Sequence, residues 1–370
     1  MARLTLPADA FHGAPAWGSG FRGLEAEPLG SFLNPLYRGA DPWVIRHDGW
    51  YYSCAAGWGN RLEVWKSSTL TRRGERQVVW APPRVGWNRA QVWAPELHRV
   101  RGRWYIYYAA SDGYNVNHRM GVLESTTDDP QGSFVDRGML YTGDHLRSGR
   151  RSRWAIDGTV LDLNDQLYFI WSGWEDHRDV QHLYVARMSD PCTISSDRVR
   201  ICPNNCHPWE RVGDREWERG LHEAPQVLVR NGRVMLIYSC SGSWQPTYKL
   251  GMLYMDQAGD PMAPHSWSKH AAPVFQSTGD VFGVGHCCFT QSPDGSEDWI
   301  LYHSKTRPWD GWSDRVVRAQ KFGWRADGFP DFGVPSPTNV RLGMPADYSR
   351  AGLLTCADAA PDQLTPRPAA

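Results

Sequence analysis

The feature that most constrains this chain is a repeated unit of three β-strands. In each copy a short first strand ends in a turn that contains glycine or Asn-Asp, which is a hairpin signal. Two strands with alternating apolar and polar residues follow it. The five first strands read DPWVIRHDG, APELHRVRG, DGTVLDLND, APQVLVRNG and HCCFTQSPDG. The strand pairs after them begin with WYYSCAAG, RWYIYYAAS, QLYFIWSG, VMLIYSCSG and DWILYHSK.

Five copies at a spacing of roughly 50–65 residues predict an all-β fold, a five-bladed β-propeller. Two β-sandwiches would account less well for the similarity between the units. We expect residues 34–345 to form the propeller and residues 1–33 to be an N-terminal extension. Residues 346–370 are rich in Ala and Pro and are expected to be a partly disordered tail. The segment near residues 330–345 is expected to close the ring against the first blade.

The composition narrows the class of partner. The chain has 370 residues, 20 tryptophans and a formal net charge of zero, so nothing indicates nucleic-acid binding. No apolar run is long enough for a membrane span. The aromatic residues have two interpretations, as strand filler or as rings that stack on sugars.

The cysteines and the N-terminal sequence bear on location. No signal peptide is visible, and the eight cysteines favour a reducing compartment. We therefore expect a cytoplasmic protein, or a secreted one if a leader was removed. Cys202 and Cys206, in CPNNC, either form a loop disulfide or stay unpaired.

Asp41, in GADPWV, stands directly before the first strand of the first unit. In a propeller the innermost strands surround the centre, and their starts face one common mouth. The corresponding positions of the other units are Trp93 to Glu96, Asp157, Glu223 and His286. The sequence therefore predicts that at least three carboxylates share one pocket.

Carboxylates that share a partly apolar pocket repel one another, and their pKa values separate. Such a pair can supply the general acid and the general base of glycoside hydrolysis. Two other interpretations stay open at this point. The acids could cap turns, or several oxygen ligands could hold calcium.

The motifs resemble those of glycoside hydrolase family 43, in order and over nearly all of residues 34–340. The resemblance rests on GADPWV, WAPELH, WAIDGTVL, HEAPQVLVRNGRVMLIYSCSGSW and GVGHCCFTQSPDGSEDWILYHSK. It implies a five-bladed propeller with inverting chemistry. By this resemblance Asp41 is the general base and Glu223 is the general acid. Asp157 orients the acid and adjusts its pKa. His286 matches a histidine that, in the family, often binds a calcium ion through waters.

Two positions depart from the family pattern. The fourth motif of the family usually reads Glu-Gly-Pro, and here Ala224 takes the place of the glycine, which is a mild change. Cys287 and Cys288 follow His286 where related sequences often have Asn-Ser. The second departure puts the metal site or the channel wall in doubt. Calcium in the central channel is the expected cofactor, and the identity of the metal stays open.

Five further residues are candidates for substrate binding. They are Trp93, beside the second motif; Arg318, assigned to an inner strand of the fifth unit; and Trp58, Trp174 and Trp244, at loops between strands. Each has a structural alternative, such as packing between blades for the tryptophan and a place on the strand surface for the arginine. His222, next to the predicted acid, receives no role.

The run LIYSCSGSWQPTYKLGMLYM and the fifth-unit motif look most like the exo-acting arabinofuranosidase branch. The resemblance therefore implies release of terminal α-L-arabinofuranosyl residues from arabinose-containing oligo- or polysaccharides. A β-xylosidase is the nearest alternative. A carbohydrate-binding propeller without activity is the alternative from another class, and the intact Asp41, Asp157 and Glu223 argue against it. The sequence does not indicate an oligomeric state.

Overall fold

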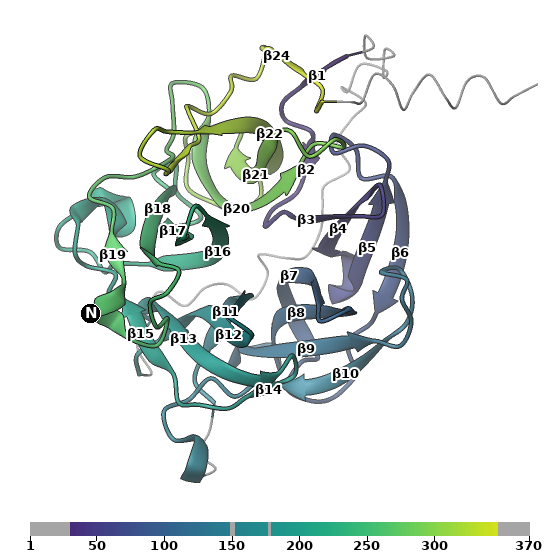
Figure 1. Ribbon diagram of the computed structural model, residues 1–370, viewed down its shortest axis with the longest axis vertical. Helices are drawn as coiled ribbons and strands as arrows, with labels where there is room; N and C mark the ends of the chain where they lie inside the picture. Colours follow the sequence, from purple (N-terminus) through teal and green to yellow (C-terminus); the bar gives the residue numbers. More distant parts are fainter. Residues whose placement is uncertain (1–29, 149–151, 177–178, 347–370) are drawn as a thin grey trace, which may run out of the picture.

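The structure, a computed structural model, describes residues 30–148, 152–176 and 179–346. In these ranges five antiparallel sheets stand in a ring around a common centre (Figure 1). Each sheet begins with its innermost strand, and the chain moves outward through the blade before it enters the next one. The predicted all-β, five-bladed propeller is confirmed.

The first three blades follow one another along the chain. Blade 1 contains β3 (Trp43–His47), β4 (Trp50–Ala56), β5 (Leu62–Ser67) and β6 (Glu75–Trp80). Blade 2 contains β7 (Ala90–Val100), β8 (Arg103–Ser111), β9 (Arg119–Ser125) and β10 (Phe134–Met139). Blade 3 contains β11 (Ala155–Leu163), β12 (Gln166–Trp174), β13 (Gln181–Asp190), β14 (Thr193–Ile194) and β15 (Val199–Cys202), and the last two both pair with β13.

The last two blades complete the ring. Blade 4 contains β16 (His222–Arg230), β17 (Arg233–Cys240), β18 (Lys249–Asp256) and β19 (Ser268–Lys269). Blade 5 contains β20 (Phe282–Gln291), β21 (Asp298–Lys305), β22 (Arg315–Trp324) and β23 (Pro330–Asp331). The described helices are short 3₁₀ turns, and none is long and apolar enough to cross a membrane. They are η1 (Trp58–Asn60), η2 (Asn115–Asn117), η3 (Leu146–Ser148), η4 (Pro208–Glu210), η5 (Val212–Asp214) and η6 (Pro264–Ser266).

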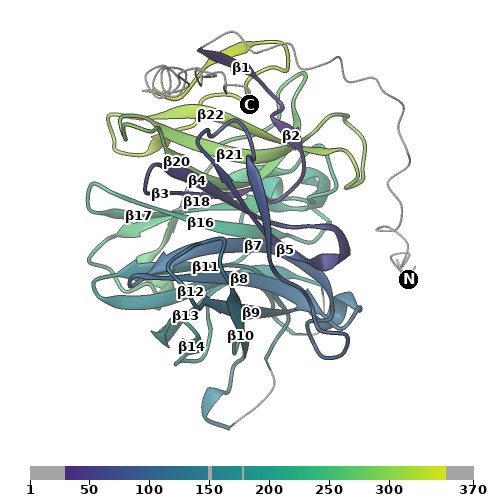
Figure 2. The same ribbon diagram turned by 90° about the vertical axis from the view of Figure 1, so that its right-hand side faces the viewer.

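The ring is closed by a strand from the N-terminal side of the propeller. β2 (Tyr37–Arg38) pairs with β22 and becomes the outer strand of blade 5 (Figure 2). The side chain of Asn34 supports this closure, because it bonds both the N–H and the carbonyl oxygen of Ala319. A strand from each end of the chain thus meets the last blade, which ties the ring shut.

The predicted contact of residues 330–345 with the first blade is present, because Leu342 and Met344 pack in the cluster between blades 5 and 1, but this segment does not provide the strand that closes the ring. β23 pairs with β22, and β24 (Arg341–Gly343) pairs with β1 (Ser31–Leu33) in a separate two-stranded sheet. The two-residue β2 was too short to be recognised as a strand. Residues 1–29 and the predicted tail from residue 347 onward lie outside the described residues.

The hydrophobic core is divided into five clusters, and each lies between two neighbouring blades. Tyr52 and Ile106 belong to the cluster between blades 1 and 2, and Tyr107 and Phe169 to the one between blades 2 and 3. The remaining clusters lie between blades 3 and 4, 4 and 5, and 5 and 1. Each blade therefore buries both faces of its sheet, and the apolar area so removed from water favours the closed ring.

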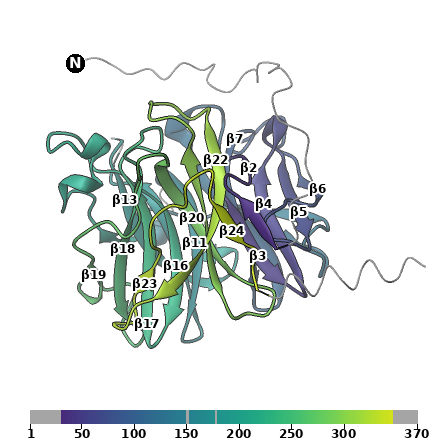
Figure 3. The ribbon, with the colours of Figure 1, turned by 90° about the horizontal axis from the view of Figure 1, so that it is seen from above.

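One end of the ring collects three chain positions from every blade. The first strand starts there, the antiparallel second strand ends there, and the third strand starts there again. Figure 3 shows the ring from the side, with strands running between its two ends. We call the end at which the first strands start the mouth. Polar residues at these positions can meet across blades.

Candidate active site

The first strands share a backbone kink at the mouth. Near the start of each first strand an equivalent residue other than glycine has positive φ: Asp41, Ala94, Asp157, Ala224 and His286, at 51°, 40°, 53°, 49° and 45°. Gln91 in blade 2 is a second such residue, at 49°. The strand register is interrupted at this point in blades 2 to 5. Such φ values are uncommon for residues with a side chain and are concentrated at functional sites.

The shared kink gives the equivalence between blades. Asp41, Asp157 and His286 occupy the same position, as predicted. Glu223 stands one residue before its equivalent, Ala224, so it approaches the mouth from a different backbone position.

Asp41 is surrounded by one guanidinium and two imidazoles from blade 5, and its backbone N–H donates to Nδ1 of His303 at 3.2 Å. Its Oδ1 lies 3.1 Å from Nη1 of Arg315 and 3.2 Å from Nδ1 of both His286 and His303. Burial by itself would raise the pKa of Asp41, but Arg315 and the two histidines lower it well below the usual range. Asp41 is therefore an ionised carboxylate that can accept a proton.

Glu223 has the opposite properties. Burial raises its pKa to about 7, and the charge on Asp41 acts in the same direction. Two hydrogen bonds oppose this shift, because Nε2 of Gln181 donates to Oε1 at 3.2 Å and the hydroxyl of Tyr248 donates to Oε2 at 2.9 Å. Below neutral pH the group is protonated and can donate a proton.

Asp157 is buried and holds the segment that carries Glu223. Its Oδ2 accepts the backbone N–H of Ala224 at 3.1 Å. Burial raises its pKa well above the usual value, and repulsion from Glu223 and Asp41 adds to the shift. Ionised Asp157 and Glu223 would repel each other, and with Asp157 protonated the pKa of Glu223 is raised by burial and by the charge on Asp41.

A stacked pair of rings connects the two sides of the site. Tyr248, which bonds Glu223, stacks on His303 with centroids 5.5 Å apart and an interplanar angle of 14°. His303 in turn contacts Asp41. Gly285 leaves room for this ring, since a Cβ there would lie 2.2 Å from Cε1 of Tyr248. The positions of acid and base are thus coupled through packed side chains.

Four contacts of the carboxylates were missed by the sequence analysis: Gln181, Tyr248, His303 and Arg315. Gln181 and Arg315 are the first residues of their third strands, and Tyr248 directly precedes another. His303 lies near the mouth end of a second strand. An inspection of polar residues at these strand ends, in addition to the first-strand starts, could have found them.

The assignment of Arg318 to an inner strand was wrong. It lies on β22, the third strand of blade 5, and its guanidinium is buried. Its bonds go to Ser304, Thr338 and the carbonyl of Ser336, so it secures the segment that follows the blade. The arginine that reaches Asp41 is Arg315, at the mouth end of the same strand.

The predicted tryptophans differ in exposure. Trp93 stacks on His118 with ring centroids 3.8 Å apart, and the buried Trp174 stacks on Trp154 with ring centroids 4.6 Å apart. Trp244 is half-buried and meets the edge of another tryptophan ring in the β21–β22 loop. Trp58 is almost fully exposed. All four lie at the mouth end of their blades. Trp93, Trp174 and Trp244 pack against other rings, as expected for the wall of a binding pocket, and Trp58 does not.

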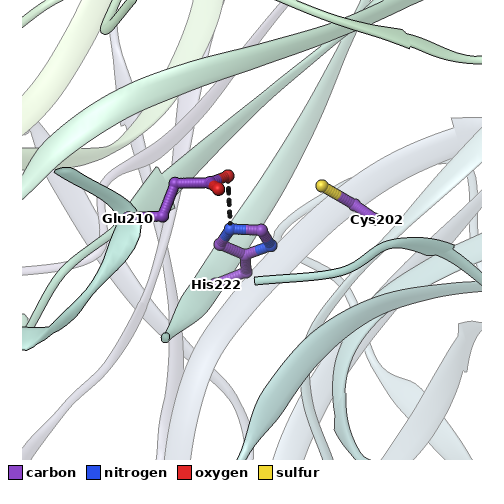
Figure 4. A group of neighbouring side chains, drawn as sticks. All are labelled: Cys202, Glu210 and His222. Carbon is purple, nitrogen blue, oxygen red and sulfur yellow. Dashed lines mark hydrogen bonds and ion pairs between the residues drawn. The ribbon is translucent and has the colours of Figure 1, made fainter. Parts of the chain in front are cut away.

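His222, the residue before Glu223, belongs to a buried polar cluster with Glu210 and Cys202 (Figure 4). Oε1 of Glu210 lies 2.9 Å from Nε2 of His222 and 2.5 Å from Nζ of Lys269. Cys202 lies close enough for these groups to hold a metal ion. The ammonium of Lys269 already neutralises the carboxylate, however, so an ion would have to displace it. The cluster fixes the backbone next to Glu223.

The departures at Cys287 and Cys288 do not alter the mouth. The Cys287 side chain packs in the cluster between blades 4 and 5, and that of Cys288 packs between blades 5 and 1. Both are buried. All the cysteines in the described part of the chain are free, including Cys202 and the exposed Cys206. Adjacent residues of a strand point to opposite faces, which explains the division.

Comparison with known proteins adds independent information. The sequence profile of Glycosyl hydrolases family 43 matches residues 32–330. Alpha-L-arabinofuranosidase B of Pyricularia oryzae is 33% identical over 87% of this chain and 68% of that protein. An extracellular exo-alpha-(1->5)-L-arabinofuranosidase of Streptomyces chartreusis is 33% identical over 82% of this chain and 91% of that protein. The crystal structure of an alpha-L-arabinofuranosidase from Lactobacillus brevis has a TM-score of 0.74 and 31% identity, and covers 84% of this chain and 98% of that one.

Replacement of Tyr248 by Phe tests the link between the rings and the acid. The change removes the hydroxyl that donates to Glu223 and keeps the ring that stacks on His303. Because this bond stabilises the ionised carboxylate, the pKa of Glu223 should rise above about 7. A carboxyl-carbon NMR titration, with Glu223→Gln to assign the signal, measures the change.

The matched control is Tyr107→Phe. Its hydroxyl donates to the carbonyl of Pro191, away from the carboxylates. This variant loses a comparable hydrogen bond and should leave the pKa of Glu223 where it was. An unchanged or lowered pKa in Tyr248→Phe would contradict the interpretation.

Proposed function

The chain belongs to glycosyl hydrolases family 43, and on that premise we propose that it is an inverting exo-α-L-arabinofuranosidase. It removes terminal α-L-arabinofuranosyl units from arabinose-containing oligo- or polysaccharides. The observation that carries the chemistry is the contrast between an ionised Asp41 and a Glu223 whose pKa is raised to about 7. The names of the relatives that cover most of this chain support the sugar.

The reaction is a single displacement. Glu223 donates its proton to the leaving oxygen, and Asp41 takes a proton from the water that attacks the anomeric carbon from the opposite face. The configuration of the released sugar is therefore inverted. A water must fit between the two carboxyl groups, which requires a separation of about 6.5–9.5 Å.

The neighbours of the two groups maintain their different protonation states. Arg315, His286 and His303 stabilise the negative charge of Asp41 before water transfers its proton. Asp157 transfers no proton. It holds the backbone of Ala224 and so orients Glu223, and its proximity disfavours a second negative charge.

The place of action is proposed from similarity. The Streptomyces chartreusis relative is named as extracellular, which gives no support for the cytoplasmic location expected from the sequence. We infer that this protein also acts outside the cell, where its polysaccharide substrate would be found. The carbohydrate substrate is the one partner that the family membership supports.

The first test of the function is a panel of nitrophenyl glycosides that includes the α-L-arabinofuranoside and the β-D-xyloside. The wild type should release arabinose, and Asp41→Ala should lose activity by about 10²–10⁴-fold because the general base is absent. A preference for the xyloside would keep the mechanism and make the protein a β-xylosidase. Binding of arabinan without hydrolysis of arabinan or of any glycoside in the panel would indicate a non-catalytic propeller.

Glu223→Ala separates proton donation from the rest of catalysis. Hydrolysis of substrates with poor leaving groups should fall by about 10²–10⁴-fold, whereas nitrophenyl substrates, whose leaving group needs little protonation, should lose less. In the wild type kcat/KM should decline as pH rises through about 7, because Glu223 then loses its proton. The low pKa of Asp41 places the acidic decline below the usual carboxyl range.

The matched measurement is the pH profile of Glu223→Ala on the activated substrate. Its decline near pH 7 should disappear while the acidic decline, which belongs to Asp41, remains. Equal losses on good and poor leaving groups would argue against the role of Glu223.

Calcium beside His286 stays a prediction from the family resemblance. Calcium takes six to eight oxygen ligands, and the Nδ1 of His286 faces Asp41. Among the described residues, the one group of three side chains that could hold a metal does not include His286. A hard cation here would therefore take most of its ligands from water, as the resemblance implies.

Removal and return of calcium tests this site. After treatment with EDTA and removal of the chelator, added Ca²⁺ should raise the melting temperature by about 4 °C or more at 100 times its Kd. The same concentration of Mg²⁺ serves as the control, because Mg²⁺ demands a smaller and stricter coordination shell. A melting temperature that does not respond to Ca²⁺ would exclude a functional calcium site.

A further inference from the structure

The most exposed aromatic side chains gather at the mouth. Within the described ranges five aromatic residues are classed as exposed: Trp58 at 94%, Trp217 at 79%, Tyr114 at 66%, Trp309 at 65% and Trp50 at 41%. The first four lie on connections at the mouth, and Trp50 begins β4 at the opposite end. Nζ of Lys66 lies 4.6 Å from the ring centroid of Trp50, and the guanidinium of Arg307 makes a similar contact with Trp309 at 5.2 Å.

The placement of the four rings follows from the topology. Trp58, Tyr114 and Trp309 lie between the second and third strands of blades 1, 2 and 5, a connection that is always at the mouth. Trp217 lies between β15 and β16, in the segment that leads to Glu223. An ion pair between Arg219 and Asp179 joins this segment to the β12–β13 connection. The four rings therefore come from different sides of the mouth.

These rings cannot serve the terminal sugar in the way that the buried residues do. Asp157, His286 and Trp174 are buried at the mouth, whereas the four rings are largely in solvent. A sugar unit seated against the carboxylates would contact the buried set. The exposed set is available to units that lie beyond the cleaved bond.

The chemistry of the four rings fits a neutral sugar chain. Exposed apolar groups that gather on one face mark an interaction site. The C–H groups on a sugar face are apolar and slightly positive, and they complement the negative face of an aromatic ring. The formal net charge of the protein is zero, so no long-range field favours a strongly charged ligand.

We propose that Trp58, Tyr114, Trp217 and Trp309 form an aromatic rim that binds the main chain of a neutral polysaccharide carrying arabinofuranosyl units. The rim holds the polymer across the mouth while one terminal unit enters the site. This inference rests on the proposed function, and it makes the preferred substrate a polymer and not a short oligosaccharide. Trp58, a candidate pocket wall in the sequence analysis, belongs to the rim.

The test compares Trp217→Ala, Trp309→Ala and the double variant on two substrates. For soluble arabinoxylan or arabinan, KM should rise about threefold for each ring and about tenfold for the double variant, as expected for the loss of one aromatic contact each. For nitrophenyl α-L-arabinofuranoside, KM and kcat should stay within about twofold of the wild type. Trp50→Ala, an exposed tryptophan at the opposite end, should change neither.

A binding measurement keeps the rim separate from catalysis. In native gels that contain arabinoxylan or arabinan, the wild type should be retarded and the double variant should not, whether or not the protein hydrolyses the polymer. Equal retardation of both, no retardation of the wild type, or equal losses on polymer and nitrophenyl substrate would overturn the rim. A concentration-dependent mass that the double variant abolishes would instead identify a surface between two copies of the chain. Failure of the nitrophenyl assay in the wild type, with retardation intact, would count against the proposed function alone.

Discussion

The burial of both faces of every blade is the constraint on which the rest of the structure depends. Each sheet carries apolar side chains on both of its faces. Cys287 and Cys288 illustrate this, because they pack toward different neighbouring blades. Such a sheet is stable only when another sheet covers each face. In a closed ring each of the five sheets covers a face of both of its neighbours, and closure brings the starts of all five first strands together. The active site is a consequence of this packing, because no local segment of the chain contains it.

The ring gives the carboxylates a common location, and their immediate neighbours give them different chemistry. Asp41 meets Arg315 and two histidines from the adjacent blade and stays ionised, although burial opposes this. Glu223 meets two neutral donors in a more apolar setting, and its pKa rises to about 7. Two groups of one chemical type thus serve as base and acid at the same pH, which is the arrangement that glycoside hydrolysis requires.

The fold and the three carboxylates could be predicted because their signals are local and repeated. The strand period and the turn residues of each unit are visible without knowledge of the other units, and Asp41 and Asp157 directly mark first strands. Ring closure was not predictable in the same way. β2 has two residues, and its pairing depends on Asn34 reaching Ala319 from nearly 300 positions away.

The substrate-side residues were harder to assign for a physical reason. Arg315 and Arg318 are separated by three positions on one strand, so they point to opposite faces. The sequence alone does not say where this strand begins or which of its faces turns toward blade 1, whereas in the structure Arg315 is the first residue of β22 and contacts Asp41. The choice of Arg318 was a choice of the wrong face. The tryptophans illustrate the same limit, because exposure distinguishes Trp58 from Trp174 and the sequence shows only that both follow a strand.

The starts of the third strands show how one repeated position supports several functions. In blades 3 and 5 the first residue of the third strand provides Gln181 and Arg315, and in blade 4 the residue directly before that strand provides Tyr248. Gln181 and Tyr248 donate to Glu223 without adding charge, and Arg315 places a full positive charge beside Asp41. Both kinds of neighbour lower the pKa of the carboxylate that they contact, but burial is outweighed only at Asp41, where Arg315, His286 and His303 act together. The residues near the starts of the third strands therefore contribute to the difference between the two carboxylates, together with burial and the two histidines of blade 5.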